Sequence, residues 1–214
     1  WLYLEPIFGS EDIMRQMPVE GRKFQGVDKF WRKTMEYAVS HPEIMVIMEQ
    51  EGLLAAFIDS NRDLDQILKG LNEYLETKRL FFARFFFLSN DELLEILSQT
   101  RDPRAVNPHL GKCFEAIGKL EFKDESEWPD IIGMYSGEGE HVTFGQTVYP
   151  SPAVETWLYD VEKVMISTLK QMAIDALKDY KLKKREDWVL QWPAMLVIMG
   201  SQFYWTAEVE ESLE

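Results

Sequence analysis

Hydrophobic positions recur at helical spacing along three long stretches of the chain. One apolar stripe covers residues 27–38 and a second covers residues 53–75. The clearest stripe covers residues 154–182 and follows Ser151 and Pro152, where serine would be the N-cap and proline the first helical residue. These stretches predict amphipathic helices as the main element of the fold.

Polar and proline-bearing segments interrupt these stripes and mark the expected helix ends. Residues 40–42 (Ser-His-Pro) should stop the first helix, because the residue before a proline disfavours helical backbone. Residues 44–48 are expected to form a short buried helical turn, and the second stripe contains a possible break at residues 59–61. A further apolar helix is expected over residues 188–205, with Pro193 in its first turn or at a kink. The candidate bend points are residues 40–42, 59–61 and 183–187.

A different periodicity appears between the second and third helical stretches. Residues 119–123 alternate between polar and apolar, as a half-buried strand does. Residues 131–136 and 141–148 flank a turn with two glycines, which predicts an antiparallel hairpin. The turn is Gly137, Glu138, Gly139 and Glu140. This hairpin either only covers the core, or uses its strand edges and acidic tip to contact another part of a larger assembly.

The most unusual stretch is a run of phenylalanines at residues 81–87, where five of the seven residues are Phe and Arg84 lies among them. So apolar a run predicts a buried strand or extended connector, in which the guanidinium of Arg84 would need a carboxylate or carbonyl partner. Ser89 and Glu92 then have the spacing of a capping box, which predicts a helix over residues 90–98. The expected structural motif comprises Phe82, Arg84, Phe85, Phe86, Phe87, Ser89 and Glu92.

Together these patterns predict a mainly α fold, an elongated helical rod or bundle with a small antiparallel β-hairpin insertion. The expected parts are a helical part with the phenylalanine-rich connector over residues 1–117, the small β element over 118–150, and the long helix with the helices after it over 151–214. With 214 residues and 46% hydrophobic content, the chain can bury a substantial core. Because it starts at Trp1 without methionine and ends in an acidic helical segment, we interpret it as a piece of a longer protein.

Charge and cysteine content narrow the classes of partner. The net charge of −14 argues against a nucleic-acid surface and suits either simple solubility or basic protein partners. Cys113 is the single cysteine, so no internal disulfide can form, and its apolar neighbours predict a packed thiol. The sequence contains neither a signal peptide nor an apolar run of about 20 residues, so no membrane association is expected.

No catalytic, cofactor-binding or metal site is expected from the motifs. The Gly-Lys pairs at 111–112 and 118–119 lack the glycine spacing and the hydroxyl residue of a phosphate-binding loop. His41, His109 and His141 lie in separate segments, without the spacing of metal ligands. An enzyme with an unrecognised site would require a bound metal or nucleotide, for which the sequence offers no site.

The phenylalanine-rich stretch, continued to residue 117, resembles the linker region of dynein heavy chains. The segments over residues 1–8, 11–18, 134–140 and 154–158 are similar to the same family, so the resemblance covers nearly the whole chain in the family's order. The sequence resembles axonemal heavy chains more than cytoplasmic ones. One departure is Ala83, where the family usually has a proline that would fix the backbone.

The resemblance implies a force-transmitting rod that precedes a ring of AAA+ modules and bends or straightens with the nucleotide state. It implies that this piece is not catalytic, and that ATP and Mg bind elsewhere in the parent chain. The turn at residues 137–140 would contact the ring of the same heavy chain, whereas the microtubule and other dynein subunits would be reached only through the parent. The expected location is cytoskeletal, in the axoneme of cilia or flagella. The alternative is a helical scaffold or adaptor that binds a protein partner and is unrelated to a motor.

Overall fold

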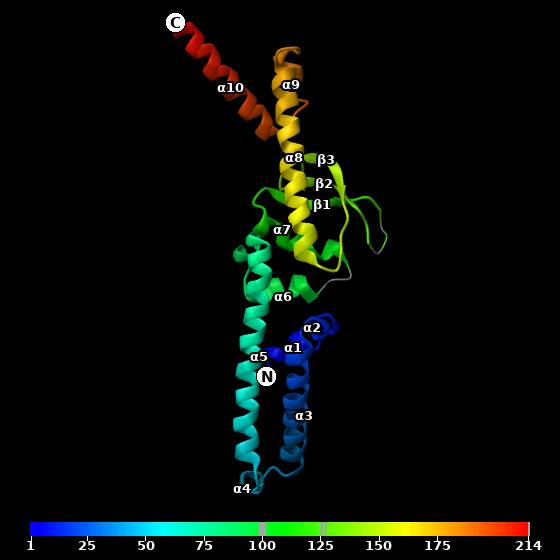
Figure 1. Cartoon of the computed structure of the whole chain (residues 1–214), viewed down its shortest axis with the longest axis vertical. Coiled ribbons are helices and arrows are strands. Elements are labelled where there is room, and N and C mark those ends of the chain that lie inside the picture. The colour runs from blue at the N-terminus through cyan, green and yellow to red at the C-terminus, as the bar shows by residue number, and fades with distance from the viewer. Residues whose placement is uncertain (99–101, 125, 127, 214) are drawn as a thin grey trace. The chain divides into compact units, whose positions relative to one another are not determined.

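The computed structural model describes residues 1–98, 102–124, 126 and 128–213. Residues 99–101, which follow the phenylalanine-rich stretch, lie outside this description. The chain divides into two compact units, unit 1 at Trp1–Thr100 and unit 2 at Arg101–Glu214 (Figure 1). The three parts expected from the sequence, 1–117, 118–150 and 151–214, stay a prediction.

Unit 1 consists of helices. In chain order they are α1 (Leu4–Phe8), α2 (Glu11–Gln16), α3 (Pro18–Ser40), α4 (Ile44–Met48), α5 (Leu53–Phe81), the 3₁₀ helix η1 (Ala83–Phe87) and α6 (Asn90–Ser98). The long helices α3 and α5 lie side by side, with α4 in the connection between them (Figure 1). Every helix of unit 1 except α4 contributes to the buried core. Its apolar members are Leu4, Phe8, Ile13, Met17, Phe24, Val27, Ile67, Leu71, Leu75, Phe82, Phe85, Leu88, Leu93, Leu94, Ile96 and Leu97.

Helix α3 is longer than the sequence predicted. It begins at Pro18 instead of near residue 27, because the buried stripe continues backwards through Phe24 and Gly21. Phe24 stacks on Phe8 of α1, with ring centroids 5.4 Å apart, so the extra turns are packed and not frayed. The predicted end at residues 40–42 is confirmed, since the helix ends at Ser40.

Helix α5 runs without interruption through residues 59–61, so the predicted break there is wrong. Phe57 packs edge-on against Phe30 of α3, with ring centroids 5.2 Å apart, and Leu64, two turns after Phe57, is half-buried. Asp59 meanwhile pairs with Arg62 one turn later, at 2.8 Å. Tertiary packing on both sides of the polar residues therefore outweighs their low helix propensity.

Helix α4 forms at the predicted residues 44–48, but the predicted burial is wrong. Ile44, Met45 and Met48 are 71%, 66% and 70% exposed. The helix has only five residues and lies in the connection between α3 and α5, where few neighbours can cover it. These three apolar side chains are therefore not part of the core of unit 1.

Unit 2 combines helices with one sheet. Its elements are the 3₁₀ helix η2 (Pro103–Val106), α7 (Asn107–Cys113), β1 (Ile117–Phe122), β2 (Ile131–Ser136), β3 (His141–Val148), α8 (Val154–Tyr180), α9 (Arg185–Val189) and α10 (Ala194–Leu213). The sheet is antiparallel in the order β1-β2-β3, with Met134 opposite both Leu120 and Val142. The predicted strands and packed Cys113 thiol are confirmed, as is the mainly α class with a small antiparallel insertion.

Helix α8 is the long helix predicted from the third stripe, but its start differs. It begins at Val154 after Ala153, so Ser151 and Pro152 precede the helix instead of capping it. The Ser151 hydroxyl instead donates to the carbonyl of Ala153 at 3.4 Å. With 27 residues, the helix is about 40 Å long at about 1.5 Å per residue.

The predicted single helix over residues 188–205 is two helices. Helix α9 ends at Val189, and α10 begins directly after Pro193, whose ring suits the start of a helix but not its interior. Trp188 is completely buried, and its indole Nε1–H donates to the carbonyl of Ala176 at 2.8 Å. Gly200 of α10 lies so close that a Cβ there would be 3.0 Å from the Trp188 ring.

Candidate functional site: the hairpin and the groove beside it

The turn between β2 and β3 is held by its own backbone and by one serine. The amide of Gly139 donates to the carbonyl of Ser136 at 3.1 Å, and Gly139 has a φ of +90°, which favours glycine. The Ser136 hydroxyl oxygen accepts from the amides of Glu138 and Glu140, at 3.3 and 3.0 Å. The predicted hairpin thus has a fixed turn, and the sequence alone did not determine its type.

The tip residue Glu140 reaches a helix that is 54 residues away in the sequence. Its carboxylate oxygen Oε1 accepts a hydrogen bond from the amide of Ala194 at 3.0 Å, at the first residue of α10. The first amides of a helix have no partner within the helix, and the positive end of its dipole favours a carboxylate. Glu140 therefore holds the start of α10, although it is exposed like Gly137, Glu138 and Gly139.

A groove of about 430 Å³ opens beside this turn, within unit 2. The sheet contributes Met134 and Val142, α8 contributes Met165 and Leu169, and α10 contributes Met195. Met134 and Val142 are each only 7% exposed, so they form a buried floor, while Met195 is 57% exposed at the mouth. The volume lies in the range of about 300–1,000 Å³ that is typical of ligand pockets.

The sheet beneath the turn carries a cross-strand pair of polar side chains. His141 Nε2 lies 2.6 Å from Glu121 Oε2, and the His141 ring packs against the Tyr135 ring with centroids 4.7 Å apart. Gly133 on the middle strand makes room for the pair, because a Cβ there would overlap with the Glu121 carboxylate and lie 2.8 Å from the carbonyl oxygen of Val142. This role of Gly133 was not predicted from the sequence, although a lone glycine inside a strand commonly marks such a close approach.

The sheet is joined to α8 by one buried threonine. Thr168 is 6% exposed, and its hydroxyl oxygen accepts from the backbone amide of Gly145 on β3 at 2.9 Å. The hairpin, α8 and the start of α10 are therefore connected by hydrogen bonds as well as by apolar packing. If the turn moved relative to α10, the hydrogen bond between Glu140 and the Ala194 amide would break. The turn is therefore not free to slide over an apolar surface.

The phenylalanine motif of unit 1 is only partly a core. Residues 83–87 form a 3₁₀ helix, so the predicted strand or extended connector is wrong. A 3₁₀ helix has about three residues per turn, which brings Phe82, Phe85 and Leu88 to one side. Phe82 and Phe85 are 1% and 0% exposed, as predicted, but Phe86 and Phe87 are 55% and 70% exposed, which the sequence did not predict. Arg84 is half-buried.

The predicted capping box at the start of α6 is confirmed. The amide of Ser89 donates to Glu92 Oε2 at 2.9 Å, and the amide of Glu92 donates to the Ser89 hydroxyl at 3.3 Å. Helix α6 spans Asn90–Ser98, the residues predicted for it. Two amides at the helix start are thereby satisfied by side chains that the sequence spacing alone identifies.

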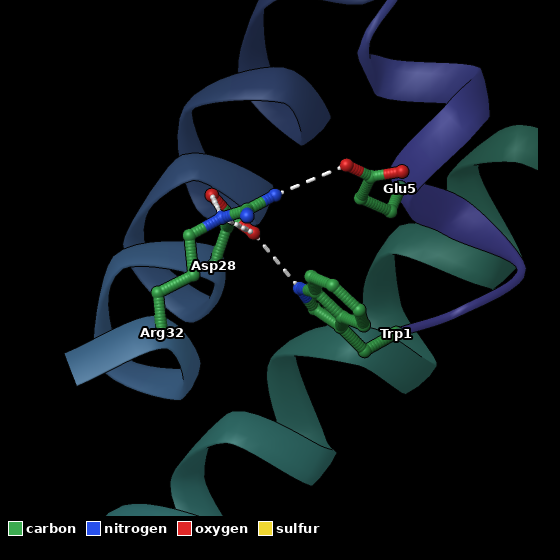
Figure 2. A network of polar contacts seen from close by, with 4 residues as sticks. All are labelled: Trp1, Glu5, Asp28 and Arg32. Atoms are coloured by element: carbon green, nitrogen blue, oxygen red, sulfur yellow. Dashed lines mark hydrogen bonds and ion pairs between the residues drawn. The ribbon is translucent and has the colours of Figure 1, made fainter. Parts of the chain in front are cut away.

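A second polar cluster lies at the start of unit 1, shown in Figure 2. The Trp1 indole Nε1–H donates to Asp28 Oδ1 at 3.0 Å, and Arg32 binds both Asp28, at 2.9 Å, and Glu5 Oε1, at 3.0 Å. These bonds, first to Asp28, raise the pKa of Arg32 above its ordinary value. The cluster fastens α1 and the preceding residues to α3, and nothing in its geometry points to a ligand.

The part of the chain that the structure describes carries neither a metal cluster nor a membrane-spanning helix. There, no three His, Cys, Asp or Glu side chains come together in a way that could hold a metal ion. None of the described helices combines the length and the apolar character that crossing a membrane would require.

Comparison with known families gives the wider context of this hairpin. The model of the family described as dynein heavy chain, N-terminal region 2, matches residues 1–176, which is most of the chain. The chain belongs to the dynein heavy-chain family. The resemblance inferred from the phenylalanine-rich stretch and the flanking segments is therefore confirmed.

Individual dynein heavy chains are about half identical to this chain. The chain is 51% identical to dynein axonemal heavy chain 1 of Mus musculus over 214 residues, covering 100% of this chain and 5% of that protein. It is 52% identical to dynein axonemal heavy chain 3 of Mus musculus over 216 residues, again covering 100% and 5%. For dynein axonemal heavy chain 12 of Homo sapiens the identity is 50% over 214 residues, covering 99% of this chain and 7% of that protein. The chain thus spans about one-twentieth of the length of such relatives.

Proposed function

We propose that this chain is a force-transmitting linker segment of a dynein heavy chain. In this role it couples ATP-driven changes in the AAA+ ring of the same heavy chain to movement along microtubules in cilia or flagella. The observation that carries the proposal is the family match over residues 1–176, together with relatives that are named axonemal heavy chains. The same membership removes the support for a scaffold unrelated to a motor.

The helices of both units are suited to transmit force. Helices α3, α5 and α8 have 23, 29 and 27 residues, and each is continuous. A lever also needs defined connections, and in unit 2 the bonds of Thr168 and Glu140 join α8 and α10 to the sheet. Docking of such a segment on different ring surfaces in different nucleotide states would favour one of two conformations.

Several roles follow for the residues singled out above. The segment itself carries out no hydrolysis, and ATP and Mg bind elsewhere in the parent chain. The turn at residues 137–140 contacts the ring, and the phenylalanine motif with its capping box keeps unit 1 rigid. Microtubules and other dynein subunits are reached only through the parent. Of the three candidate bend points, residues 40–42 lie between the end of α3 and the start of α4, and residues 183–187 cover the start of α9 after the end of α8. Residues 59–61 lie inside α5.

The proposal can be tested by weakening α8 within the parent heavy chain. Ile166 is 41% exposed on this helix, so Ile166→Pro breaks the helix without removing a core side chain. We expect microtubule gliding to slow by about tenfold, while the rate of ATP hydrolysis stays within about twofold of the wild type. A kinked lever transmits less movement to the microtubule but does not change the site of hydrolysis.

Two further variants make this experiment decisive. Ile166→Ala keeps the helix and should glide at the wild-type speed, whereas Ile166→Gly should give an intermediate speed, because glycine lowers helix stability without a kink. Unchanged gliding in Ile166→Pro, with circular dichroism confirming the lost helix, would contradict the lever role.

A further inference from the structure

The groove beside the hairpin has an apolar interior and an acidic rim. Three glutamates line it, Glu115 next to β1 and Glu138 and Glu140 at the hairpin turn, and all three are exposed. None of the described residues that line the groove is a lysine or an arginine. The Lys119 ammonium lies over the Tyr135 ring at 4.7 Å and is not part of the lining.

This combination selects for a particular ligand chemistry. The floor of Met134 and Val142 and the wall of Met165 and Leu169 would be covered by a large aliphatic or aromatic side chain. Methionine side chains adapt their shape easily, so the groove can accept more than one such side chain. The carboxylates at the rim favour a cation just outside the apolar part, and lysine and arginine supply both an aliphatic stem and a cation.

We propose that the groove binds a basic amphipathic polypeptide segment, with an apolar side chain in the groove and a lysine or arginine at the rim formed by Glu115, Glu138 and Glu140. The inference rests on the proposed function, in which the ring is the neighbour of the hairpin, and it assigns the chemistry of the ring segment that docks there. The other possible occupants, an acidic segment or a second copy of this chain, differ in charge and in stoichiometry.

Occupation of the groove has a consequence for α10. Glu140 lines the groove and also accepts the hydrogen bond from the Ala194 amide. A cation that binds at the rim competes with this amide for the carboxylate. Met195, the next residue of α10, forms part of the groove mouth. The bound segment therefore acts directly on the first turn of α10.

The test uses the whole 214-residue chain and two synthetic peptides of equal length. One is an amphipathic helix of leucine and arginine, and the other has glutamate in place of each arginine. We expect the basic peptide to bind with 1:1 stoichiometry in fluorescence anisotropy and to weaken as salt rises, while the acidic peptide does not bind. Hydrogen exchange should become faster at the first amides of α10 when the basic peptide is bound.

Matched variants locate the binding site. The double change Glu115→Gln and Glu138→Gln should weaken binding by about tenfold, since two ion pairs at the rim are lost. Met195→Arg should abolish binding by placing a cation at the mouth of the groove. The control variants Glu49→Gln and Met45→Arg change exposed residues of the same types in unit 1, and they should bind the basic peptide as the wild type does.

The outcomes separate this inference from the proposed function. Equal binding of both peptides, no binding of the basic peptide, or equal effects of groove and control variants would each overturn the inference. If the basic peptide fails to bind while Ile166→Pro still uncouples gliding from hydrolysis, the lever stands and only the partner chemistry is wrong. Groove-specific binding without uncoupling in Ile166→Pro would overturn the lever and leave the groove chemistry intact.

Discussion

Thr34 in unit 1 and Thr168 in unit 2 are both buried threonines inside long helices, but their hydroxyls bond differently. The Thr34 hydroxyl donates to the Phe30 carbonyl of its own helix, whereas Thr168 accepts from the Gly145 amide of the sheet. The two units differ in the same way as a whole. Unit 1 is held mainly by apolar packing between helices, together with a bond from Arg79 to the Leu88 carbonyl at 3.2 Å. In unit 2 such side-chain bonds to the backbone of other elements are more frequent.

The difference follows from the elements that each unit uses. A long helix satisfies almost all of its own backbone groups, so only its side chains need partners. Strands at a sheet edge and short helices leave some backbone N–H and C=O groups without a backbone partner. These groups need hydrogen bonds from side chains of other elements. In unit 2, Thr168 meets this need at strand β3, and Glu140 accepts from the first amide of α10, which has no partner within its helix. Trp188 adds a bond to a carbonyl of α8. The stability of unit 1 should therefore depend mainly on the volume of its buried side chains. The stability of unit 2 should depend on individual side-chain hydrogen bonds as well.

The largest effect is expected for Trp188→Ala. It removes a completely buried ring and leaves the Ala176 carbonyl without its indole donor, so unfolding should become easier by about 4–5 kcal/mol. Urea denaturation followed by circular dichroism measures this change. Trp205→Ala, at a residue 67% exposed, should change stability by less than about 0.5 kcal/mol. Similar losses of stability in the two variants would contradict the burial of Trp188 and its bond to Ala176.

Phe85→Ala in unit 1 should cost about 3–4 kcal/mol, because the ring is completely buried and a cavity remains. Phe87→Ala, two residues later, should cost less than about 0.5 kcal/mol, because that ring is 70% exposed. The pair tests the 3₁₀ conformation directly by chemical denaturation. If both substitutions were equally harmful, the connector would instead be buried on all sides.

Gly133→Ala should cost about 1–3 kcal/mol through overpacking. The new Cβ would be 2.8 Å from the Val142 carbonyl oxygen, which cannot move without disturbing the sheet, and would displace the Glu121 carboxylate from His141. Gly137→Ala is the control, since no atom would approach its Cβ within 4 Å. Thermal melting of the two variants compares them, and equal melting temperatures would contradict the close approach at Gly133.

Exchanging threonine for valine tests the comparison of the two helices most directly. Thr168→Val keeps the shape but leaves the Gly145 amide without its acceptor, so it should cost about 1 kcal/mol. Thr34→Val removes only a bond to its own helix and should be within about 0.5 kcal/mol of the wild type. Equal losses in denaturant titrations would mean that unit 2 does not depend on polar contacts more than unit 1.

The smallest effect concerns the phenol of Tyr3. Burial, followed by the charge of Asp91 and its hydrogen bond, raises the pKa of Tyr3 above its ordinary value. The protonated phenol is thus favoured in the folded state. This contribution to stability is present below the unfolded pKa of about 10 and is lost as pH rises through the folded pKa. Asp91→Asn should lower the pKa of Tyr3 partway, as measured by NMR titration, and an unchanged pKa would exclude Asp91 as a cause.

The sequence was most informative where a local rule decides the structure. The capping box of Ser89 and Glu92, the helix end at Ser40 and the three strands depend on nearby residues, and all were predicted. It was least informative where packing decides. The continuity of α5 through residues 59–61 depends on α3, and the exposure of Phe86 and Phe87 depends on a 3₁₀ conformation that composition does not reveal.

The candidate site shows the same limit. The turn at residues 137–140 was identified from its glycines, but its bond to Ala194 joins positions 54 residues apart. The groove likewise draws on three strands and two helices, so its lining could not be recognised from spacing. Met165 belongs to the helical stripe over residues 154–182, and only the three-dimensional arrangement shows that it lines the same groove as Glu138 and Met195.

Gly200 sets how closely α10 can approach Trp188, because a Cβ at position 200 would be 3.0–3.1 Å from the indole ring. The two positions are therefore expected to vary together during evolution. A heavy chain with alanine or a larger residue at position 200 should carry a smaller ring at position 188, or hold the helix equivalent to α10 at a different angle. This pair of positions offers a way to sort heavy chains by the direction of that helix from sequence alone.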